Sequence, residues 1–447
     1  MTTTATQPTM MPPPHGAGAD TITAFIVSAH PMDVASWLDQ LPREGAWQYL
    51  SDVEVSRRVK VFASLPLDVQ ADLARAASRP ELVEIISAMD ADDRVDLFNV
   101  LTVEEQQALE PHLESDDRAD IRHLSTYDEG TAGALMTSNF ATLSAGMTGG
   151  QAIAALRRAA PGSETIYRSY ILDKAGRLIG SVRLHELILL DEDHPIAEMM
   201  EKTPIAVTPD MGQEDVAKTI ARYDLLAVPV VDADNRLVGI VTHDDATDAM
   251  QAETTEDFQR ISTVLPFTES LRAVGVGVLY SKRIVWLALL VFGNLFSGAG
   301  IAYFEEMILA YVSLVFFLPL LIDSSGNAGS QSATLMVRAL ATGDVALSDW
   351  RNLILRELVV AAALGATMAL VVLPLGAWRG GPDVALVVGL TMFCVVIVGS
   401  LVGMSLPFVL SRLRLDPATA SGPLVTTISD GVGVLLYFSV ATLILSG

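Results

Sequence analysis

The sequence predicts a multidomain membrane protein with an all-α N-terminal domain, a repeated α/β domain, a connecting helix and five membrane-spanning helices. Three observations support this fold class. The whole net charge of −24 lies in residues 1–270, because residues 271–447 hold nine acidic and nine basic residues. Five apolar stretches follow residue 283. Residues 135–250 contain an internal repeat. An acidic soluble half is therefore joined to an apolar half.

The N-terminal part of the soluble half is expected to be a disordered tail followed by short helices. Residues 1–24 are rich in Thr, Pro, Gly and Ala and cannot bury a core. They also lack the basic and apolar segments of a signal peptide. From there on apolar residues recur at helical spacing, as in Val59, Phe62 and Leu65. We therefore expect residues 25–132 to form a superhelix of helical hairpins.

The internal repeat predicts two similar α/β domains over residues 133–250. The segment 173–182, which begins Asp-Lys-Ala-Gly-Arg, aligns with the segment 232–241, which begins Asp-Ala-Asp-Asn-Arg. Each copy has a strand, a polar turn, a second strand and a helix. We expect a separate connecting helix over residues 251–273, beside the membrane.

The apolar half predicts five spanning helices within residues 274–447. The stretches are roughly 284–304, 307–336, 353–378, 383–410 and 417–446, and each reaches the ~20 residues that a spanning helix needs. Seven Lys and Arg residues fall on the side of the soluble half and one on the other side. This bias predicts a protein of the plasma or inner membrane with a cytoplasmic N-terminus and an extracytoplasmic C-terminus. Because five spans carry no visible internal two-fold repeat, a pore on a symmetry axis would require a homodimer.

Asp430 is a lone carboxylate near the middle of the fifth stretch. An ionisable group at membrane depth is costly unless it faces water, a partner or an ion. Thr426 and Gly422 lie one and two turns earlier on the same stripe and offer hydroxyl and carbonyl oxygens. Oxygen ligands suit hard cations such as Mg²⁺. We therefore predict an ion-binding site in a pore; the alternative is a carboxylate that hydrogen-bonds within the helix bundle.

Small and polar residues crowd the second stretch over residues 322–331. This density is expected to loosen or break the helix, and irregular backbone at membrane depth is tolerated where it lines a cavity. Gly326 and Asn327 are accordingly predicted to line the pore. The alternative is close helix packing through small residues.

Composition excludes several other functions. The strong negative charge argues against nucleic-acid binding, which requires basic patches. The apolar half contains Cys394 but no histidine, which argues against a pathway for copper or zinc. No paired acid and base, nucleophile triad or metal-hydrolase motif supports an enzyme.

Acidic residues gather around the expected connecting helix. Glu253, Glu256 and Asp257 lie on it, and further acids precede them at 244, 245 and 248. Like-charged surfaces repel one another unless a cation neutralises them. These acids therefore predict an ion sensor; the alternative is a solvated acidic face.

The repeat resembles a tandem pair of CBS domains, most closely in the second copy, Ala227–Asp232 and Gly239–Asp245. This resemblance implies that Thr242 and Asp245 face the phosphate and ribose of a nucleotide, with ATP as the expected ligand. The alternatives are a purely structural pair and a metal-sensing pair.

Nearly the whole chain after residue 25 resembles the MgtE family of magnesium channels. The motifs that carry the resemblance are 322–331, Asp416-Pro417 and 422–430. The resemblance implies a homodimeric Mg²⁺-selective channel that cytoplasmic Mg²⁺ closes through a plug helix, the connecting helix. It places the pore carboxylate on Asp430. It places the regulatory acids on Asp224, Asp245, Asp248, Glu253, Glu256 and Asp257, with Glu214, and draws the helical domain's ligand from Asp90, Asp92 and Asp93. The alternative is an ion-coupled secondary transporter of divalent cations.

Overall fold

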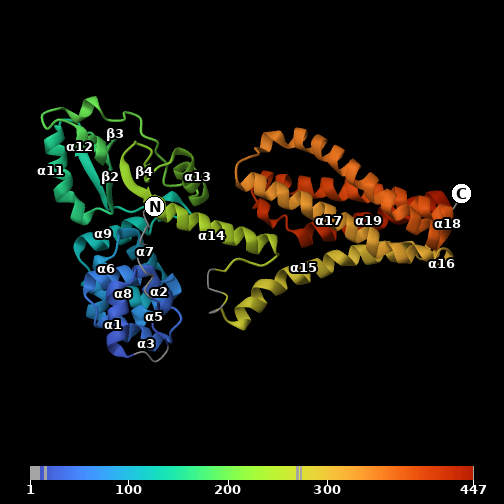
Figure 1. Cartoon of the computed structure of the whole chain (residues 1–447), viewed down its shortest axis with the longest axis horizontal. Coiled ribbons are helices and arrows are strands. Elements are labelled where there is room, and N and C mark those ends of the chain that lie inside the picture. The colour runs from blue at the N-terminus through green and yellow to red at the C-terminus, as the bar shows by residue number, and fades with distance from the viewer. Residues whose placement is uncertain (1–10, 15–17, 268–270, 272–273, 446–447) are drawn as a thin grey trace, which may run out of the picture. The chain divides into compact units, whose positions relative to one another are not determined.

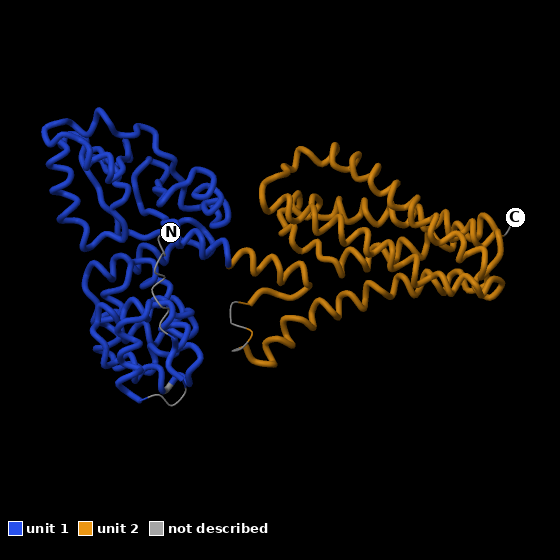
Figure 2. The backbone as a smooth tube through the Cα atoms, viewed as in Figure 1, with its two compact units in different colours: residues 1–251 blue, residues 252–447 orange. Residues whose placement is uncertain are grey.

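The chain folds into two compact units, residues 1–251 and residues 252–447 (Figure 1 and Figure 2). The computed structural model describes residues 11–14, 18–267, 271 and 274–445. Helix α14, His243–Ile261, passes without interruption from the first unit into the second. The two units are described separately below.

Nine short helices form the described part of the N-terminal domain, and they begin at regular intervals along the chain, at positions 19, 31, 43, 55, 67, 79, 91, 103 and 115. They are α1 Ala19–Ser28, α2 Pro31–Leu38, α3 Arg43–Ser51, α4 Val55–Ala63, α5 Leu67–Ala76, α6 Arg79–Ala88, α7 Ala91–Val100, α8 Val103–Leu109 and α9 Ser115–Leu124. Helices two apart in sequence pack together, as α2 does with α4, α3 with α5, and α5 with α7. This is the all-helical arrangement of hairpins that the apolar spacing predicts, but the constant interval between helix starts is an additional regularity.

A long polar side chain closes the turn before several of these helices. Each donor reaches backbone carbonyls five residues and seven or eight residues earlier, at 2.7–3.3 Å. The donors are Arg58, Gln70, Arg94 and Gln106. The carbonyls at a helix end have no partner within the helix. Each of these donors binds the carbonyls of the turn that precedes its own helix, so the donors recur at multiples of the interval between helix starts. Leu82 occupies the corresponding position of α6.

The repeated α/β domains follow. The first contains α10 Ala132–Leu135, β1 Phe140–Ser144, α11 Gly149–Ala159, β2 Thr165–Leu172, β3 Leu178–Arg183 and α12 Leu184–Leu189; the second contains α13 Gln213–Tyr223, β4 Ala227–Val231, β5 Leu237–Thr242 and the start of α14. Strand β2 pairs with β1 in parallel and with β3 antiparallel, and β4 pairs antiparallel with β5.

The two hairpin turns confirm the repeat residue by residue. Asp173 Oδ1 accepts the backbone N–H groups of residues 175 and 177, at 2.8 and 2.9 Å. Asp232 Oδ1, at the aligned position of the second copy, accepts those of residues 234 and 236, at 2.9 and 2.8 Å. The turns also bind each other, because Leu178 N–H donates to the Asn235 carbonyl at 2.9 Å. The copies therefore pair through equivalent turns.

The helical domain and the second α/β copy share one hydrophobic core. Leu97 and Phe98 of α7 belong to the same buried cluster as Val228 of β4, Val241 of β5 and Ala246 of α14. The first copy has a core of its own around Ile171. Shared packing of this kind fixes α7 and the start of α14 within one unit, where both contribute to the acidic cluster described below.

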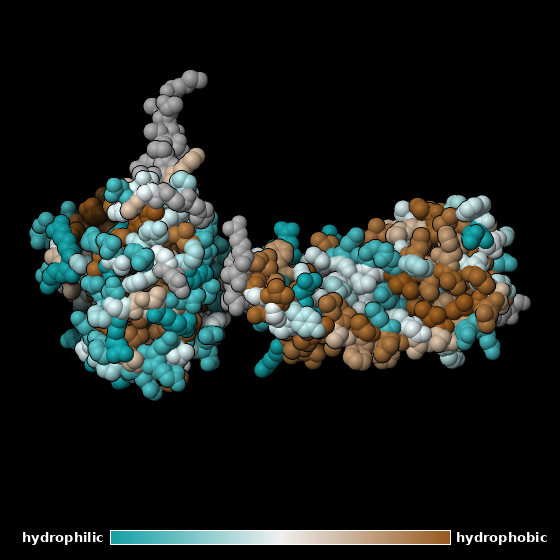
Figure 3. Space-filling view, turned by 90° about the horizontal axis from the view of Figure 1, so that it is seen from below, coloured by the Kyte–Doolittle hydropathy of each residue, from teal (hydrophilic) through white to brown (hydrophobic). Residues whose placement is uncertain are grey.

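The second unit is a bundle of long helices. They are α15 Val276–Tyr303, α17 Ser313–Ala341, α18 Trp350–Arg412 and α19 Gly422–Leu445, with short α16 Glu305–Ala310 between the first two. Gly381, at φ 84°, divides α18 into two helices. Three segments of the described residues are long and apolar enough to cross a membrane: 276–303, 347–412 and 422–445. Apolar residues also cover much of this unit's surface in Figure 3.

The expectation that residues 322–331 break the second spanning helix is wrong. Helix α17 continues through them, because its small residues allow α18 to approach the α17 backbone. A Cβ atom added to Gly329 would lie 2.8 Å from the carbonyl oxygen of Gly399, and one added to Gly403 would collide with the Gly329 carbonyl. Ser325 donates its hydroxyl to the Val395 carbonyl at 3.0 Å. The small residues of this stretch therefore pack closely against α18, and the assignment of Gly326 and Asn327 to the pore stays a prediction.

Two expected boundaries also need correction. Helix α1 begins at Ala19, within the expected tail, and the carbonyl of buried Pro13 accepts a hydrogen bond from Trp37 Nε1 at 3.3 Å. Residues 1–10 and 15–17 of that tail lie outside the described residues. The expected boundary at 250/251 falls inside α14. This helix ends at Ile261, where Thr263 adopts a positive φ and the Val264 N–H binds the Gln259 carbonyl in a Schellman motif; residues 268–270 and 272–273 of the expected connecting helix are not described.

Candidate ion-sensing cluster and ion-conducting site

An acidic cluster lies where α7, the segment before β2 and the first turn of α14 meet. Asp90 is the N-cap of α7 and Asp92 and Asp93 lie in its first turn, whereas Asp244 and Asp245 begin α14. Carboxylate oxygens of Glu164, Asp244 and Asp245 lie within 4.8 Å of one another. Both helices present their N-termini to the cluster, where the helix dipole favours negative charge.

The cluster raises the pKa values of its carboxyl groups. Burial and the neighbouring Asp90 raise the pKa of Asp93 to about 7. Burial and Asp92 raise the pKa of Glu164 to about 9. Burial is also the main cause of the raised pKa values of Asp92 and Asp245, to which Asp93 and Asp92 respectively add. These carboxylates repel one another in a partly dehydrated space, so that a bound divalent cation would stabilise the folded unit.

Four predicted regulatory acids lie in or beside this cluster. Asp90 and Asp248 each interact electrostatically with Asp244, and Asp93 interacts with Asp245. Glu164 was not predicted, because a single acid in a connecting segment far along the chain from α7 gives no local signal. Asp244 was noted as part of the acidic run but not as a ligand, because consecutive acids at a helix start give no reason to choose it.

Two other predicted acids lie at the two ends of α13. Glu214 forms an ion pair with Lys218 at 2.8 Å, one turn along the helix. Asp224 caps the C-terminus of α13 with a φ of 51°, in the left-handed region. The sequence-based ligand assignment of these two residues stays a prediction.

The remaining predicted regulatory acids lie on the second half of α14. Glu253, Glu256 and Asp257 fall in the residues of α14 that belong to the second unit. Glu256 forms an ion pair with Arg260, and Arg260 also contacts Asp416 at 3.0 Å. A positive side chain thus already accompanies the acids of this helix.

The predicted nucleotide residues contact each other. The Thr242 hydroxyl donates a hydrogen bond to Asp245, and Thr242 is 4% exposed. Asp245 also faces the acids of the cluster, which would repel a phosphate in the absence of a cation. The structure therefore brings Thr242 and Asp245 together. The Thr242 hydroxyl, however, already donates to Asp245 and would have to leave it to bind a phosphate.

The predicted pore residues of α17 and α19 face each other across a narrow polar contact. Thr426 donates its hydroxyl to the Gly422 carbonyl at 2.9 Å, and Ser330 donates to the same carbonyl at 3.3 Å. A Cβ atom added to Gly326 would lie 2.8 Å from the methyl carbon of Thr426. Hydroxyl and carbonyl oxygens are therefore gathered where two helix backbones approach closely.

Asp430 lies one turn beyond Thr426 on α19. Its Oδ1 is buried and has no hydrogen-bond partner among the described residues. Asp323 of α17 is close enough to interact with it electrostatically. Asp323 and Asn327 are one turn apart on α17, and both are exposed. The sequence analysis did not assign Asp323 to the site. It could have done so, because Asp323 is a second carboxylate within an apolar stretch.

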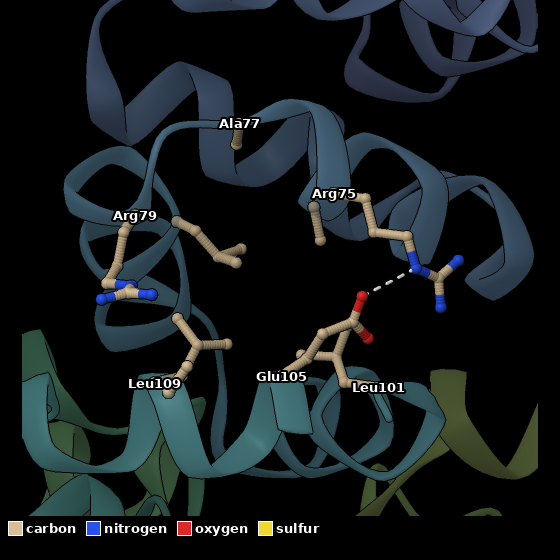
Figure 4. A pocket seen from close by; sticks show the side chains of 9 residues that line it. Arg75, Ala77, Arg79, Leu101, Glu105 and Leu109 are labelled. Carbon is tan, nitrogen blue, oxygen red and sulfur yellow. Dashed lines mark hydrogen bonds and ion pairs between the residues drawn. The ribbon is translucent and has the colours of Figure 1, made fainter. Parts of the chain in front are cut away.

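A cavity of about 300 Å³ lies away from both sites, between α5, α6 and α8 (Figure 4). Leu82 stands where α4, α5, α7 and α8 carry a polar donor, and it lines the cavity together with Ala77 and Leu109. Arg75 and Glu105 form an ion pair at 3.0 Å at its edge. The cavity thus coincides with the one interruption among the donors at 58, 70, 94 and 106.

Known proteins match this chain along its length. The MgtE intracellular N domain matches residues 29–130, the CBS domain matches residues 132–193 and 196–252, and the MgtE divalent cation transporter domain matches residues 318–440. The magnesium transporter MgtE of Thermus thermophilus is 42% identical over 323 residues, which are 71% of each chain. The chain belongs to the MgtE family.

Other MgtE proteins extend this similarity. The magnesium transporter MgtE of Bacillus subtilis is 31% identical over 421 residues, covering 94% of this chain and 93% of the relative. The solved cytosolic domain of the Mg²⁺ channel MgtE in complex with ATP is 34% identical, with a TM-score of 0.50, and covers 52% of this chain and 94% of that chain. These matches confirm the predicted fold class of helical domain, CBS pair and apolar helices.

Proposed function

We propose that this chain is a Mg²⁺ channel that imports the ion across the cell membrane and closes when its acidic cytoplasmic half binds Mg²⁺. The observation that carries this proposal is the position of Asp430. Its buried Oδ1 has no hydrogen-bond partner among the described residues, it lies one turn beyond Thr426 on α19, and it interacts electrostatically with Asp323 of α17. Membership of the MgtE family supports Mg²⁺ as the cargo.

In the pore, Asp430 would supply a negative field and the neighbouring groups would supply neutral oxygens. Mg²⁺ prefers oxygen ligands and keeps several of its waters. A site with few protein ligands and one or two carboxylates therefore attracts the ion without holding it in a dry cage. Gly422 and Thr426 line the same stretch of α19, and Asn327 with Gly326 contribute from α17.

In the soluble half, the acidic cluster would act as the sensor. Without a cation its carboxylates keep protons or repel one another, which opposes packing of α7 against the start of α14. Bound Mg²⁺ neutralises them and stabilises the packed unit by mass action. We assign Asp90, Asp93, Asp245 and Asp248 to this sensor, and we add Glu164 and Asp244 because their carboxylate oxygens lie within 4.8 Å of those of Asp245. Asp224, Glu214 and the acids Glu253, Glu256 and Asp257 complete the proposed set.

The proposed assembly is a homodimer of chains with five spans each, with the soluble half in the cytoplasm. Helices α15, α17, the two parts of α18, and α19 are the five spans. Lys282 and Arg283 in α15, Arg412 at the end of α18 and Arg414 just beyond it lie on the cytoplasmic side under the positive-inside rule. A two-fold axis would bring two copies of Asp430 towards one pore.

ATP binding by the CBS pair is a further part of the proposal, supported by the solved MgtE cytosolic domain in complex with ATP. It requires the Thr242 hydroxyl to leave Asp245 and turn to a phosphate. Calorimetry with the full chain tests it: ATP should bind the native chain and bind Thr242→Val at least about tenfold more weakly. Equal affinity would remove Thr242 from the site.

The direct test of the pore is Mg²⁺ uptake into liposomes that contain the purified full chain. The inward Mg²⁺ gradient is the sole driving force, with no proton or sodium gradient, so that flux by the native chain also rejects obligatory coupling. We expect Asp430→Ala to abolish uptake, because the field at the narrow part of the pore is lost. Asp430→Asn, which keeps size and oxygen but not charge, should lose most of it.

The control is Ser324→Ala on α17, whose hydroxyl binds only the Leu320 carbonyl of its own helix among the contacts described, at 2.7 Å. This variant should transport like the native chain. Chemical cross-linking should report the same dimer for all variants. Native uptake by Asp430→Ala would remove this residue from the pore.

A further inference from the structure

Arg260, in the last turn of α14, contacts two carboxylates on different elements. Its guanidinium binds Glu256 one turn earlier, and its Nε lies 3.0 Å from Asp416 Oδ2. About one-third of each of the Arg260 and Asp416 side chains is exposed. Asp416 immediately precedes η5, Pro417–Thr419, the short turn between α18 and α19. The ion pair therefore joins the end of α14 to the segment that leads into α19.

The second oxygen of Asp416 fixes that segment. Asp416 Oδ1 accepts the Ala418 N–H at 2.8 Å and so caps η5. Ala418 and Ala420 are buried, and Ile261 of α14 packs against the same small cluster. Helix α19 begins two residues later, at Gly422. One side chain thus links a helix that carries predicted sensor acids to the start of the helix that carries Asp430.

The same turn of α14 is also attached to the start of α15. Gln259 accepts the Phe267 N–H at 2.9 Å and donates to the Phe267 carbonyl at 3.1 Å. Lys282 of α15 donates to the Pro266 carbonyl at 2.6 Å. These bonds restrain the chain that leaves α14. Arg260 and Ile261 contact the turn before α19, so that a displacement of α14 along its axis would reach this turn through them.

We propose that Arg260 is a positioning residue that couples Mg²⁺ binding on α14 to the position of α19, and hence to pore closure. This inference rests on the proposed function. Glu256 and Asp416 share one guanidinium. When Mg²⁺ neutralises Glu256, the guanidinium is left to Asp416, which strengthens the link in the Mg²⁺-bound state. A partly exposed ion pair is weak on its own. The contact between Arg260 and Asp416 can therefore break when the channel opens and form again when it closes.

The test is closure of the full-length channel by internal Mg²⁺, measured as current in excised patches. The variants are Arg260→Gln, Asp416→Asn and the double variant; Asp416→Asn keeps the oxygen that caps η5. Each single variant should leave about 3- to 10-fold more current at saturating internal Mg²⁺ than the native chain, as expected for a lost coupling contact. The double variant should show no more current at saturating internal Mg²⁺ than the single variant with the larger current.

Three further readouts separate coupling from a general defect. Current without internal Mg²⁺ should be native in all variants. Arg260→Lys, which keeps the charge, should restore at least half of the closure. Protection of the soluble half from proteolysis by Mg²⁺ should keep its native midpoint in Arg260→Gln, because the sensor still binds the ion.

Complete closure of Arg260→Gln would overturn the proposal, as would additive effects in the double variant. A closure midpoint at lower Mg²⁺ in Arg260→Gln would also overturn it, because Arg260 would then be a competitor for the ion and not a link. Failure of the native chain to close would contradict the proposed function itself, independently of Arg260.

Discussion

At the scale of single residues, the proposed pore depends on which oxygens α17 and α19 present to each other. Asp430 is predicted from the sequence alone, since a carboxylate in an apolar helix is costly unless it has a partner, water or an ion. Asp323 becomes part of the site only when α17 is seen to be a continuous helix that faces α19. If α17 were broken as expected, Asp323 would not be placed opposite α19 in this way.

Asp323 gives the residue-scale prediction. Asp323→Asn should raise the Mg²⁺ concentration for half-maximal flux several-fold while leaving some maximal flux, because the field at the site falls but Asp430 remains. Flux into liposomes across a range of external Mg²⁺ measures both quantities. Unchanged concentration dependence would show that Asp323 does not contribute to the site.

Other residues of the sites could not be derived from the sequence. Glu164 joins the acidic cluster only through the packing of the first CBS copy beside α7, a contact between segments that are far apart in the sequence. In contrast, Asp245 and Asp248 follow a recognisable strand and lie one turn apart on one helix. A local sequence pattern can therefore predict the site residues that lie on one helix. A site residue contributed by a distant segment, such as Glu164, becomes evident only from the tertiary packing.

At the scale of elements, glycine decides how closely helices α17 and α18 approach. Gly399 and Gly403 of α18 lie against the backbone of α17 at Ser325 and Gly329. The sequence predicts five spans from their length and hydropathy, and this number stays a prediction. It could not decide whether small residues break a helix or allow a neighbour to approach, because both outcomes use the same residue types.

The close approach predicts opposite effects for two Gly→Ala substitutions. Gly403→Ala should lower the melting temperature of the purified chain, because the new Cβ collides with the Gly329 carbonyl and overpacking typically costs about 1–3 kcal/mol. Gly298→Ala, on α15, is the matched control. Among the described residues, no atom outside the neighbouring backbone of its own helix lies within 4 Å of its added Cβ, and alanine is the better helix former by about 0.5–1 kcal/mol.

Equal melting temperatures for the two variants would mean that the contact between α17 and α18 is not tight.

The regular spacing of α1–α9 was only partly predictable from the sequence. Apolar spacing revealed the helices, but their constant interval became evident only from the helix starts and from the polar donors at 58, 70, 94 and 106.

At the scale of the whole molecule, the proposed function makes the same ion the cargo of one unit and the signal of the other. The charge of −24 concentrates in the half that contains the acidic cluster. Helix α14 runs from that cluster to Arg260 as one uninterrupted element. The domain order was evident from the sequence, whereas the continuity of α14 across the expected boundary was not, because neither glycine nor proline marks a helix that simply continues.

The raised pKa values predict how pH acts on the soluble half. Asp93 titrates near its ordinary value in the unfolded chain but at about 7 in the folded one, and Glu164 at about 9. Between the two values the folded chain holds protons that the unfolded chain releases, so the free energy of unfolding falls as pH rises from about 4 to about 7 and beyond. Without Mg²⁺, the soluble unit should melt several degrees lower at about pH 8 than at about pH 5.5.

Saturating Mg²⁺ should remove most of this pH dependence, because the ion replaces the protons on the same carboxylates. Calorimetry at the two pH values, with Mg²⁺ and with a chelator, measures the effect. A melting temperature that rises with pH in the chelator would contradict the account of the cluster.

The most direct test of the whole account is the Mg²⁺ dependence of closure after the sensor acids are neutralised. Asp245→Asn, Asp248→Asn and Glu256→Gln are combined in one chain, and Asp191→Asn, Glu192→Gln and Asp193→Asn, in an exposed loop, form a control with the same change of charge. In excised patches, the account predicts that the sensor variant keeps conducting at internal Mg²⁺ concentrations that close the control and the native chain. Closure of the sensor variant at the native midpoint would contradict it.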